Sequence, residues 1–303
     1  MQRERRGPWI IRRPDCALGN PGGTAFRAVS RIQSGTAQRS NPLKIIRPYQ
    51  PLGQLCDNLG DNLVERGASS VLDLKTEDVI LIGTPWFWDG CQISEKYQWL
   101  EQQLDAHPGS RFIALGIGSC LPLVSPIEWL LKGETVEPCK RIWSRFKTIT
   151  VRDPLAYEFL TAIGVESKLL PCPSVLCLLP DVTPTPGSEL FIDATCWHKS
   201  MEEARSAIHV PGGDRFIYNS GPCDSNRLDS LIRFWMGYES IVSVRIHAVL
   251  PLLQARKISV VPTDSRALTA THLGVPAWPD EPKIIPLDTS IIRSQYLDIL
   301  NSL

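Results

Sequence analysis

Arg245 and His247 are the two residues of this chain best suited, by type and spacing, to bind an anion together. They lie two residues apart in Ile241–Leu250, an apolar run with the composition of a strand. Residues two apart on a strand point to the same face, so the guanidinium and the imidazole would project together. Arg can bind a carboxylate or a phosphate with two hydrogen bonds, and the N-terminus of a following helix would add positive charge. The alternative is a half-buried strand whose Arg reaches solvent and whose His hydrogen-bonds the backbone.

Arg152 is a second candidate for anion binding, because it ends the apolar strand predicted at 147–152. Asp153 follows it and precedes a proline, which is the pattern of a helix start, so we predict a structural role for Asp153. A Gly116-x-Gly118 pair follows another predicted strand, but no third glycine completes a dinucleotide-binding fingerprint.

Asn58, Gly60 and Asp61 lie immediately before or at the start of a helix predicted at 61–67. Glycine allows the backbone to approach a ligand closely, and the first turn of a helix offers N–H donors. Asp61 could face a substrate as a general base, or it could be a plain N-cap.

Trp86 and Trp88 occur in the segment 83–90, directly after a predicted buried strand. Two indoles at a strand end could form a platform for the apolar face of a sugar. Core packing is the alternative for at least one of them, because aromatic side chains bury large areas.

Short apolar runs alternate with amphipathic segments along the chain, which is typical of parallel sheets with crossover helices. We predict strands at 44–47, 78–83, 111–116, 147–152, 168–171, 189–193, 215–218, 241–250 and 258–262, and helices at 61–67, 94–106, 154–163, 201–208, 226–237, 248–256 and 288–303. The Pro-rich stretch 179–188 is the best linker candidate. The fold class is therefore α/β, with two Rossmann-like domains and a ligand cleft between them.

The predicted domains are 44–180 and 181–303, with the last helix able to pack back on the first domain. Residues 1–43 are strongly basic and lack periodicity, so we predict a loosely ordered arm. The whole chain has 32 basic and 32 acidic residues among 303, which argues against a general nucleic-acid binder.

Nine cysteines are scattered and form no C-x-x-C pair, as expected of reduced thiols in a cytoplasmic protein. His and acidic residues are not clustered at metal-ligand spacing, so the sequence indicates no metal site and no bound cofactor. No apolar run reaches membrane-spanning length, and no apolar core follows the basic start as in a signal peptide. A peripheral position at the inner face of a membrane is compatible with the basic arm.

The order of these segments resembles the polysaccharide pyruvyl transferase family. That family has an early N-x-G-D motif, a strand-end loop, a strand ending in V-R-D before a helix closed by x-x-G-V, and a late R-x-H-A segment. The corresponding positions here are Asn58–Asp61, Gly83–Gly90, Val151–Asp153 with Ile163–Val165, and Arg245–Ala248 through Pro262. The downstream segments Asp264–Arg266 and His272–Val275 also fit the family's ending, so the resemblance covers about 44–278.

Two departures from the family pattern lie in the first predicted domain, 44–180. The resemblance implies that this domain binds the acceptor substrate and that 181–303 binds the donor substrate. The usual glycine cluster after the second strand is replaced by Gly83-Thr84-Pro85-Trp86, and an expected D-P motif appears as Cys172-Pro173. Arg152, Arg245 and His247 are intact.

The resemblance implies a fold similar to GT-B glycosyltransferases and transfer of pyruvate from phosphoenolpyruvate to two hydroxyls of a sugar, forming a ketal in a polysaccharide such as an exopolysaccharide. Arg152, Arg245 and His247 would bind phosphoenolpyruvate, and His247 would also donate a proton to the departing phosphate. Asp61 would act as general base. Asn58, Gly60, Trp86 and Trp88 would bind the sugar or glycan acceptor, which could be linked to a lipid diphosphate.

Two alternatives remain open from the sequence. A GT-B glycosyltransferase that uses a nucleotide sugar would share the fold, but would need a carboxylate near the ribose, for which Glu239 is the nearest candidate. A catalytically inactive sugar-binding relative is the other alternative. The sequence identifies neither the acceptor nor the group that protonates the methylene carbon.

Overall fold

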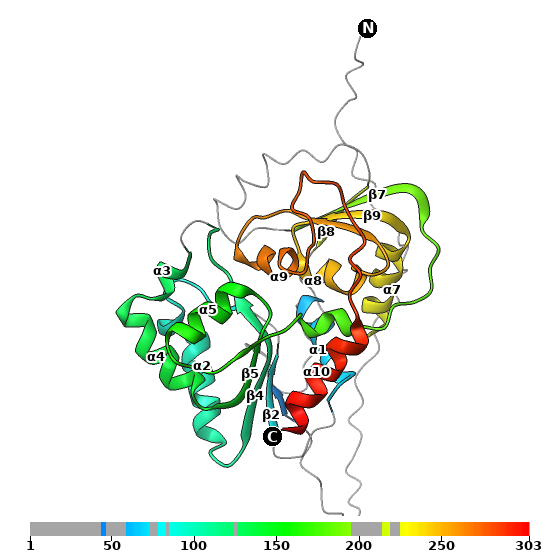
Figure 1. Ribbon diagram of the computed structural model, residues 1–303. Coiled ribbons are helices and arrows are strands. Elements are labelled where there is room, and N and C mark those ends of the chain that lie inside the picture. The colour runs from blue at the N-terminus through cyan, green and yellow to red at the C-terminus, as the bar shows by residue number, and fades with distance from the viewer. Residues whose placement is uncertain are drawn as a thin grey trace, which may run out of the picture. The chain divides into compact units, whose positions relative to one another are not determined.

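The structure of the protein is a computed structural model that describes residues 44–46, 59–72, 78–82, 85–123, 126–194, 214–218 and 225–302. The stretch Asn41–Leu303 forms one compact unit, whose described parts are coloured in Figure 1. The predicted basic arm at 1–43, Asn58 and the predicted helix at 201–208 lie outside the described residues.

The first half of the chain builds a parallel sheet of six strands. Its strands are β1 (Lys44–Ile46), β2 (Asp78–Ile82), β3 (Pro85–Phe87), β4 (Arg111–Ser119), β5 (Phe146–Val151) and β6 (Lys168–Leu169). The spatial order is β1-β2-β4-β5-β6, with β3 paired to β4. These described strands follow one another in a single direction, whereas a Rossmann sheet reverses direction once at a switch point.

Both faces of this sheet are covered, because alternate residues of each strand pack into different cores. Ile80 of β2 belongs to one core, whereas its neighbours Val79 and Leu81 belong to the other. Figure 1 shows a group of helices on one side of β4 and β5, with α1 and α10 on the other. The first group comprises α2 (Glu95–Ala106), α3 (Pro126–Leu130), α4 (Gly133–Trp143) and α5 (Pro154–Ala162), and on the other side α1 spans Leu59–Ser69. Two short 3-10 helices also belong to this half, η1 (Cys91–Ile93) and η2 (Pro173–Leu176).

The second half builds a parallel sheet of four strands, in the order β10-β9-β7-β8. Its elements are β7 (Thr185–Ala194), β8 (Asp214–Tyr218), α7 (Ser225–Met236), β9 (Tyr238–Ser243), α8 (Ile246–Val249), η3 (Leu250–Leu252), β10 (Lys257–Val260), η4 (Ser265–Ala267), α9 (Leu268–Thr271) and α10 (Thr289–Asn301). The chain steps from β7 outward to β8 and then back past β7 to β9. This reversal places a switch point between β7 and β9, and ligands of α/β sheets bind at the carboxyl ends of strands at such points.

The predicted α/β class and parallel sheets are confirmed, but the predicted strand at 241–250 is wrong beyond Ser243. The Ser243 hydroxyl accepts the N–H of Arg245 at 2.9 Å and donates to the Arg245 carbonyl at 2.9 Å. This local pairing turns the chain out of the sheet, and His247 therefore lies in the helix α8. The predicted helix at 248–256 is also wrong, because α8 has four residues and is followed by the 3-10 turn η3.

The start of α5 agrees with the prediction. The Asp153 side chain accepts the N–H of Ala156, Pro154 occupies the first turn, and Gly164 at φ 74° lies just beyond the helix end. Asp61, by contrast, is not an N-cap, because α1 begins two residues earlier at Leu59 and Asp61 lies within its first turn.

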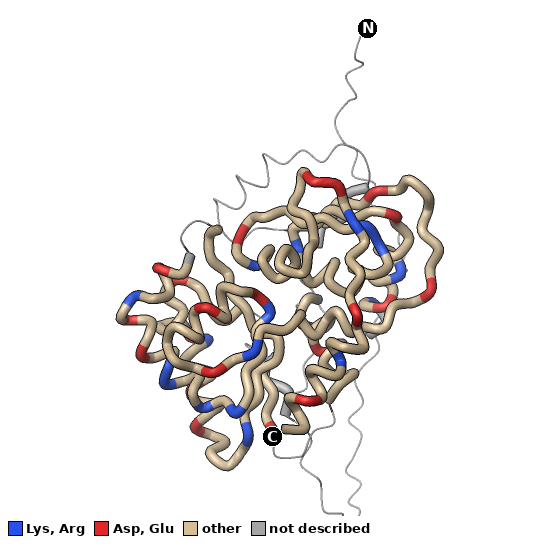
Figure 2. The backbone as a smooth tube through the Cα atoms, in the orientation of Figure 1, with Lys and Arg blue, Asp and Glu red and all other residues tan. Residues whose placement is uncertain are grey.

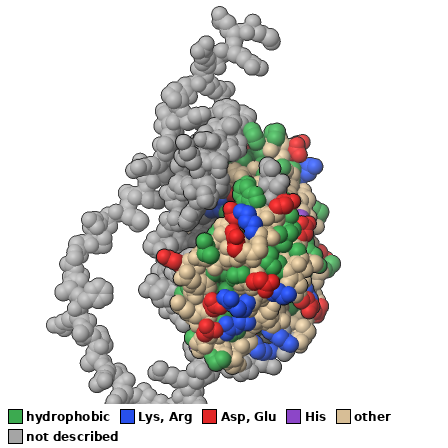
Figure 3. Space-filling model, turned by 90° about the vertical axis from the view of Figure 1, so that its left-hand side faces the viewer, with side chains coloured by type: hydrophobic (Ala, Val, Ile, Leu, Met, Phe, Trp, Pro, Cys, Tyr) green, Lys and Arg blue, Asp and Glu red, His purple; other side chains and the backbone are tan. Residues whose placement is uncertain are grey.

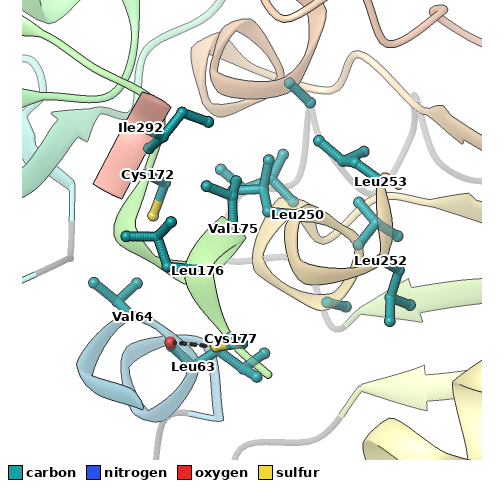
Figure 4. Packing of buried hydrophobic residues seen from close by; sticks show 14 of the residues in the cluster. Leu63, Val64, Cys172, Val175, Leu176, Cys177, Leu250, Leu252, Leu253 and Ile292 are labelled. Atoms are coloured by element: carbon teal, nitrogen blue, oxygen red, sulfur yellow. Dashed lines mark hydrogen bonds between the residues drawn. The ribbon is translucent and has the colours of Figure 1, made fainter. Parts of the chain in front are cut away.

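One hydrophobic core joins the two halves of the compact unit. It contains residues of α1, the η2 segment, the η3 turn and α10, several of which are drawn in Figure 4. The thiol of Cys177 also donates to the carbonyl of Leu63 at 3.1 Å. Helix α10 packs back on the first half, since Tyr296 donates to Pro171 O at 2.7 Å and Arg293 donates to Ser70 O at 2.6 Å.

Acidic and basic residues are interspersed along α2–α5 (Figure 2). Two exposed ion pairs join α2 to the end of α4 and the turn after it, Arg141–Glu101 and Arg145–Asp105. Figure 3 shows hydrophobic side chains scattered among charged ones on the face it presents. Among the described residues, no helix is both long and apolar enough to cross a membrane.

Gly67 is the closest contact between α1 and η2, because a methyl group at this position would overlap the Pro173 carbonyl group. We therefore expect Gly67→Ala to lower the free energy of unfolding by about 2 kcal/mol or more, although alanine favours helices. Gly133→Ala in α4 is the matched control, since nothing lies within 4 Å of the added methyl. Urea unfolding of both variants tests this, and a Gly67→Ala protein as stable as the unsubstituted one would contradict the packing described.

Candidate functional site

Arg152 lies at the carboxyl end of β5 and is completely buried. Its Nη1 atom lies 3.3 Å from the Gly116 carbonyl oxygen and 2.9 Å from Nε2 of His247. A guanidinium can only donate hydrogen bonds, so Nε2 of His247 must accept. His247 is therefore neutral, with its proton on Nδ1, and this contact joins the first half of the chain to the second.

Gly118 makes room for Arg152. A Cβ atom at position 118 would lie 2.5 Å from Oδ2 of Asp153 and 2.7 Å from Nε of Arg152. Gly116, at φ 65°, is equally restricted, because a Cβ atom there would lie 2.5 Å from Cδ of Pro173. Gly118 therefore serves close packing around a buried arginine, whereas Gly116 serves the contact of β4 with Pro173.

Asp153 begins a hydrogen-bonded chain that crosses to the second half. It accepts the N–H and the hydroxyl of Ser119, each at 2.8 Å, and the N–H of Ala156 at 2.9 Å. Because the Ser119 proton goes to this carboxylate, the hydroxyl of Ser265 must donate to Ser119 Oγ, at 2.8 Å. Ser265 Oγ in turn accepts the Leu121 N–H at 2.8 Å. Burial raises the pKa of Asp153, and these donors and Arg152 oppose that shift. The predicted structural role of Asp153 is confirmed.

Arg245 and His247 lie together after β9, but on a turn and a short helix instead of on one strand face. Arg245 precedes α8 in extended conformation, and both side chains are half-buried. Burial lowers the pKa of His247 well below its ordinary value, and the charges of Arg152, Arg266 and Arg245 lower it further. The charges of three guanidinium groups thus act on one neutral imidazole.

Arg266 was not among the predicted site residues. It lies in η4, and its Nε and Nη2 atoms donate to the two carboxylate oxygens of Asp264 at 2.8 and 2.5 Å. Asp264 also accepts the Arg266 N–H, so the guanidinium is held in one orientation. Burial raises the pKa of the Cys120 thiol, which follows the end of β4. The charges of three nearby arginines oppose this rise: Arg266, Arg152 and Arg245.

Lys96 is a second site residue that the sequence did not reveal. It projects from α2, is 5% exposed, and donates to the Pro85 carbonyl oxygen at 2.6 Å. Its Nζ atom lies 4.0 Å from the ring centroid of Trp86 and 5.2 Å from that of Trp88. The pKa of Lys96 is lowered to about 7, chiefly by burial. The charge of Asp61 opposes this shift, and that of Arg152 adds to it.

The predicted acceptor residues differ in how far they are buried. Trp86 is fully buried in edge-to-face contacts with Tyr97 and Trp143, at ring-centroid distances of 5.8 and 5.7 Å, so its ring offers no surface to a sugar. Trp88 is half-buried beside Lys96, and Asp61 and Gly60 are buried in the first turn of α1. Asn58 and the segment Gly83-Thr84 lie outside the described residues.

Cys172 and Pro173 stand where the family pattern predicts Asp and Pro. Pro173 begins η2 and packs on Gly116. Burial raises the pKa of the Cys172 thiol, while the charge of Arg152 and a hydrogen bond with it oppose that shift. A neutral thiol therefore lies beside Arg152. In the part of the chain that the structure describes, no group of three or more His, Cys, Asp or Glu side chains is placed to hold a metal ion.

Two solved structures resemble the chain only distantly. A functionally uncharacterized protein from Klebsiella pneumoniae has 9% sequence identity and a TM-score of 0.47, with 76% of this chain and 88% of that chain covered. A putative UDP-N-acetylglucosamine 2-epimerase from Listeria monocytogenes has 11% identity and a TM-score of 0.35, with 80% and 70% covered. No curated protein matches the chain.

The comparison with protein families is decisive. The model of one family matches residues 42–250, which is more than half of the chain and includes Asp61, Lys96, Arg152 and both Arg245 and His247. The buried Arg152, the neutral His247 and Arg245 all lie in this matched region, whereas Arg266 lies beyond its end. The chain belongs to the polysaccharide pyruvyl transferase family.

Proposed function

We propose that the protein transfers the pyruvyl group of phosphoenolpyruvate to two hydroxyls of one sugar in a polysaccharide or glycan precursor, forming a pyruvate ketal. The observation that carries this proposal is the contact of Arg152 Nη1 with His247 Nε2 at 2.9 Å, beside Arg245 and Arg266. Phosphoenolpyruvate carries a carboxylate and a phosphate, and converging guanidinium groups match both anionic groups.

The burial of the site residues divides the work among them. Arg245 and His247 are half-buried and are assigned direct contact with phosphoenolpyruvate, whereas Arg152 has no exposed surface. Arg152 therefore fixes the imidazole and contributes its charge to the field at the donor. Arg266, held by Asp264, adds a further positive charge that acts on His247.

His247 acts as a hydrogen-bond donor in this arrangement. Arg152 occupies Nε2, so Nδ1–H is the polar atom that the imidazole offers to the phosphate. Protonation at Nε2 would place two donors 2.9 Å apart, next to three positive charges. The proton-donor role expected for His247 is therefore not part of the proposal, and another group supplies acid–base catalysis.

The acceptor would approach from the side of α1 and α2, where Gly60, Asp61 and Trp88 lie. In this view the two α/β halves serve as GT-B-like acceptor and donor sides, and Asp61 is near enough to Lys96 to affect its pKa. The acceptor is a sugar or glycan, with a lipid-diphosphate-linked precursor at the inner membrane face as the corresponding cellular setting. No cofactor is required beyond phosphoenolpyruvate as donor.

Glu239 does not support the alternative that the protein uses a nucleotide sugar. It lies near the amino end of β9, six residues before Arg245, and strands rise about 3.3 Å per residue. It binds Lys257 at 2.7 Å and accepts the Gly187 N–H at 2.5 Å, so this carboxylate is engaged away from the arginine cluster.

Arg245→Ala tests donor binding directly. We expect the unsubstituted protein to bind phosphoenolpyruvate in calorimetric titration, and the variant to lose about 100-fold in affinity, because a charge-assisted contact in a desolvated site is worth roughly 3 kcal/mol. Arg141→Ala on α4 is the control, since Arg141 is exposed and pairs with Glu101 at 2.9 Å. UDP and GDP should not bind; a nucleotide that binds in place of phosphoenolpyruvate would favour the glycosyltransferase.

The protonation state of His247 is a separate prediction. Since its pKa lies well below the ordinary value, the imidazole should stay neutral at pH 6 and above, and become charged only as the pH falls further. Two-dimensional ¹H–¹⁵N spectra of the imidazole nitrogens should show the Nδ1–H tautomer throughout pH 6–8, with His247→Gln used for assignment. A His247 resonance that titrates near pH 6.5 would contradict the proposed hydrogen bond.

A further inference from the structure

Within the proposed pyruvyl transfer, on which this assignment rests, we propose that Lys96 is the acid–base residue that protonates the methylene carbon of phosphoenolpyruvate and takes the proton of the first attacking hydroxyl. Neither the family motifs nor the predicted site residues include it. It is the described lysine that projects from α2 to Pro85, the first residue of β3.

The register of β3 and β4 brings Lys96 close to Arg152. Lys96 Nζ binds the carbonyl oxygen of Pro85, and Pro85 pairs with Gly118 on the neighbouring strand, about 4.8 Å away in a sheet. Gly118 is the residue against which the Arg152 side chain packs. The ammonium group is therefore bound at the start of β3 and the guanidinium lies at the end of β5, and both strands pair with the last residues of β4.

Several elements around Lys96 contribute charged or titratable groups to its environment. Asp61 comes from α1, Cys91 from η1, Cys120 from the end of β4 and Arg152 from the end of β5. Cys120 has Arg245 and Arg266 as neighbours as well, so the same side chain borders the lysine and the donor-binding arginines. The charges of Asp61 on the acceptor side and of Arg152 on the donor side therefore both act on Lys96.

The pKa of about 7 suits a group that must both give and take a proton. A catalyst whose pKa matches the working pH has both forms populated, whereas an ordinary lysine, with a pKa near 10.4, holds its proton too tightly to return it quickly. The rings of Trp86 and Trp88 shield the ammonium on one side and stabilise its charged form by cation–π contact.

The protons of the reaction balance with one such group. The Lys96 ammonium gives a proton to the methylene carbon, which becomes a methyl group, and C2 becomes cationic. The oxygen of the first sugar hydroxyl forms a bond to C2, and its proton returns to the Lys96 amine. The C2–O bond to phosphate then breaks with the electron pair leaving on phosphate, the second hydroxyl oxygen bonds to C2, and its proton departs with the phosphate.

The test uses the linkage between the Lys96 proton and the bound anion. Phosphoenolpyruvate should raise the pKa of Lys96, so its affinity should fall about tenfold between pH 7 and 9 in the unsubstituted protein. This range lies above the phosphate ionisation near pH 6. In Lys96→Met and in Lys96→Arg, whose charge is fixed, the affinity for phosphoenolpyruvate should change less than about threefold between pH 7 and 9. Calorimetric titration measures this affinity.

Lys96→Arg also separates chemistry from folding, because it keeps the cation and should retain phosphoenolpyruvate affinity at pH 7. Lys140→Met, on the exposed face of α4, should keep the unsubstituted pH dependence. In protein labelled with ¹³C at lysine Cε, the Lys96 signal should titrate near pH 7 and shift to higher pH with phosphoenolpyruvate. Lys257, whose pKa is raised by Glu239, should not titrate in this range.

The outcomes separate this assignment from the proposed function. The assignment of Lys96 is overturned, and donor binding stands, if phosphoenolpyruvate binds and its affinity has the same pH dependence in all variants. The same conclusion follows if the titration of the Lys96 signal does not change when phosphoenolpyruvate binds. If phosphoenolpyruvate does not bind the unsubstituted protein at any pH, the proposed function is overturned and the role of Lys96 falls with it.

Discussion

Burying the guanidinium of Arg152 costs free energy unless its charge is hydrogen-bonded, because the group loses its water. The Gly116 carbonyl and Nε2 of His247 provide hydrogen bonds at 3.3 and 2.9 Å, and the missing side chain of Gly118 provides space. The neutral state of His247 and the glycine at position 118 both follow from the burial of this one side chain. Removing any of these partners would leave a buried charge with fewer hydrogen bonds.

The environment of the buried guanidinium requires both halves of the compact unit, since Arg152 and His247 come from the regions of different sheets. Two further contacts hold these sheets together: the core shared by α1, η2, η3 and α10, and the hydrogen-bonded chain from Asp153 through Ser119 to Ser265. The serine chain ends next to Arg266, so the same loop that fastens the two halves also delivers a site charge. The geometry of the site is therefore a property of the packed unit.

Most strands of the fold were predictable from the sequence, because fully buried parallel strands are continuous apolar runs. The short strand β3 was not, because its residues lie in a segment that we interpreted as a loop. The segment after β9 was not, since the apolar run continues to Leu250 while a hydroxyl of Ser243 diverts the backbone. Arg152 and His247 were found through local motifs at strand ends. Lys96 has no such motif: its role depends on the pairing of β3 with β4 and on burial, which arise only in the folded chain.

The lowered pKa of Lys96 follows chiefly from burial, because the ammonium group has lost most of its water. The charge of Arg152 lowers this pKa further, whereas the carboxylate of Asp61 opposes the shift. The thiol of Cys172, whose pKa is raised by burial, is neutral at pH 7 and does not offset the guanidinium of Arg152. A trianionic donor would oppose the lowered pKa, because its negative charge favours the ammonium form. Binding of phosphoenolpyruvate thus favours the ammonium form of Lys96, which in the proposed reaction gives its proton to the methylene carbon.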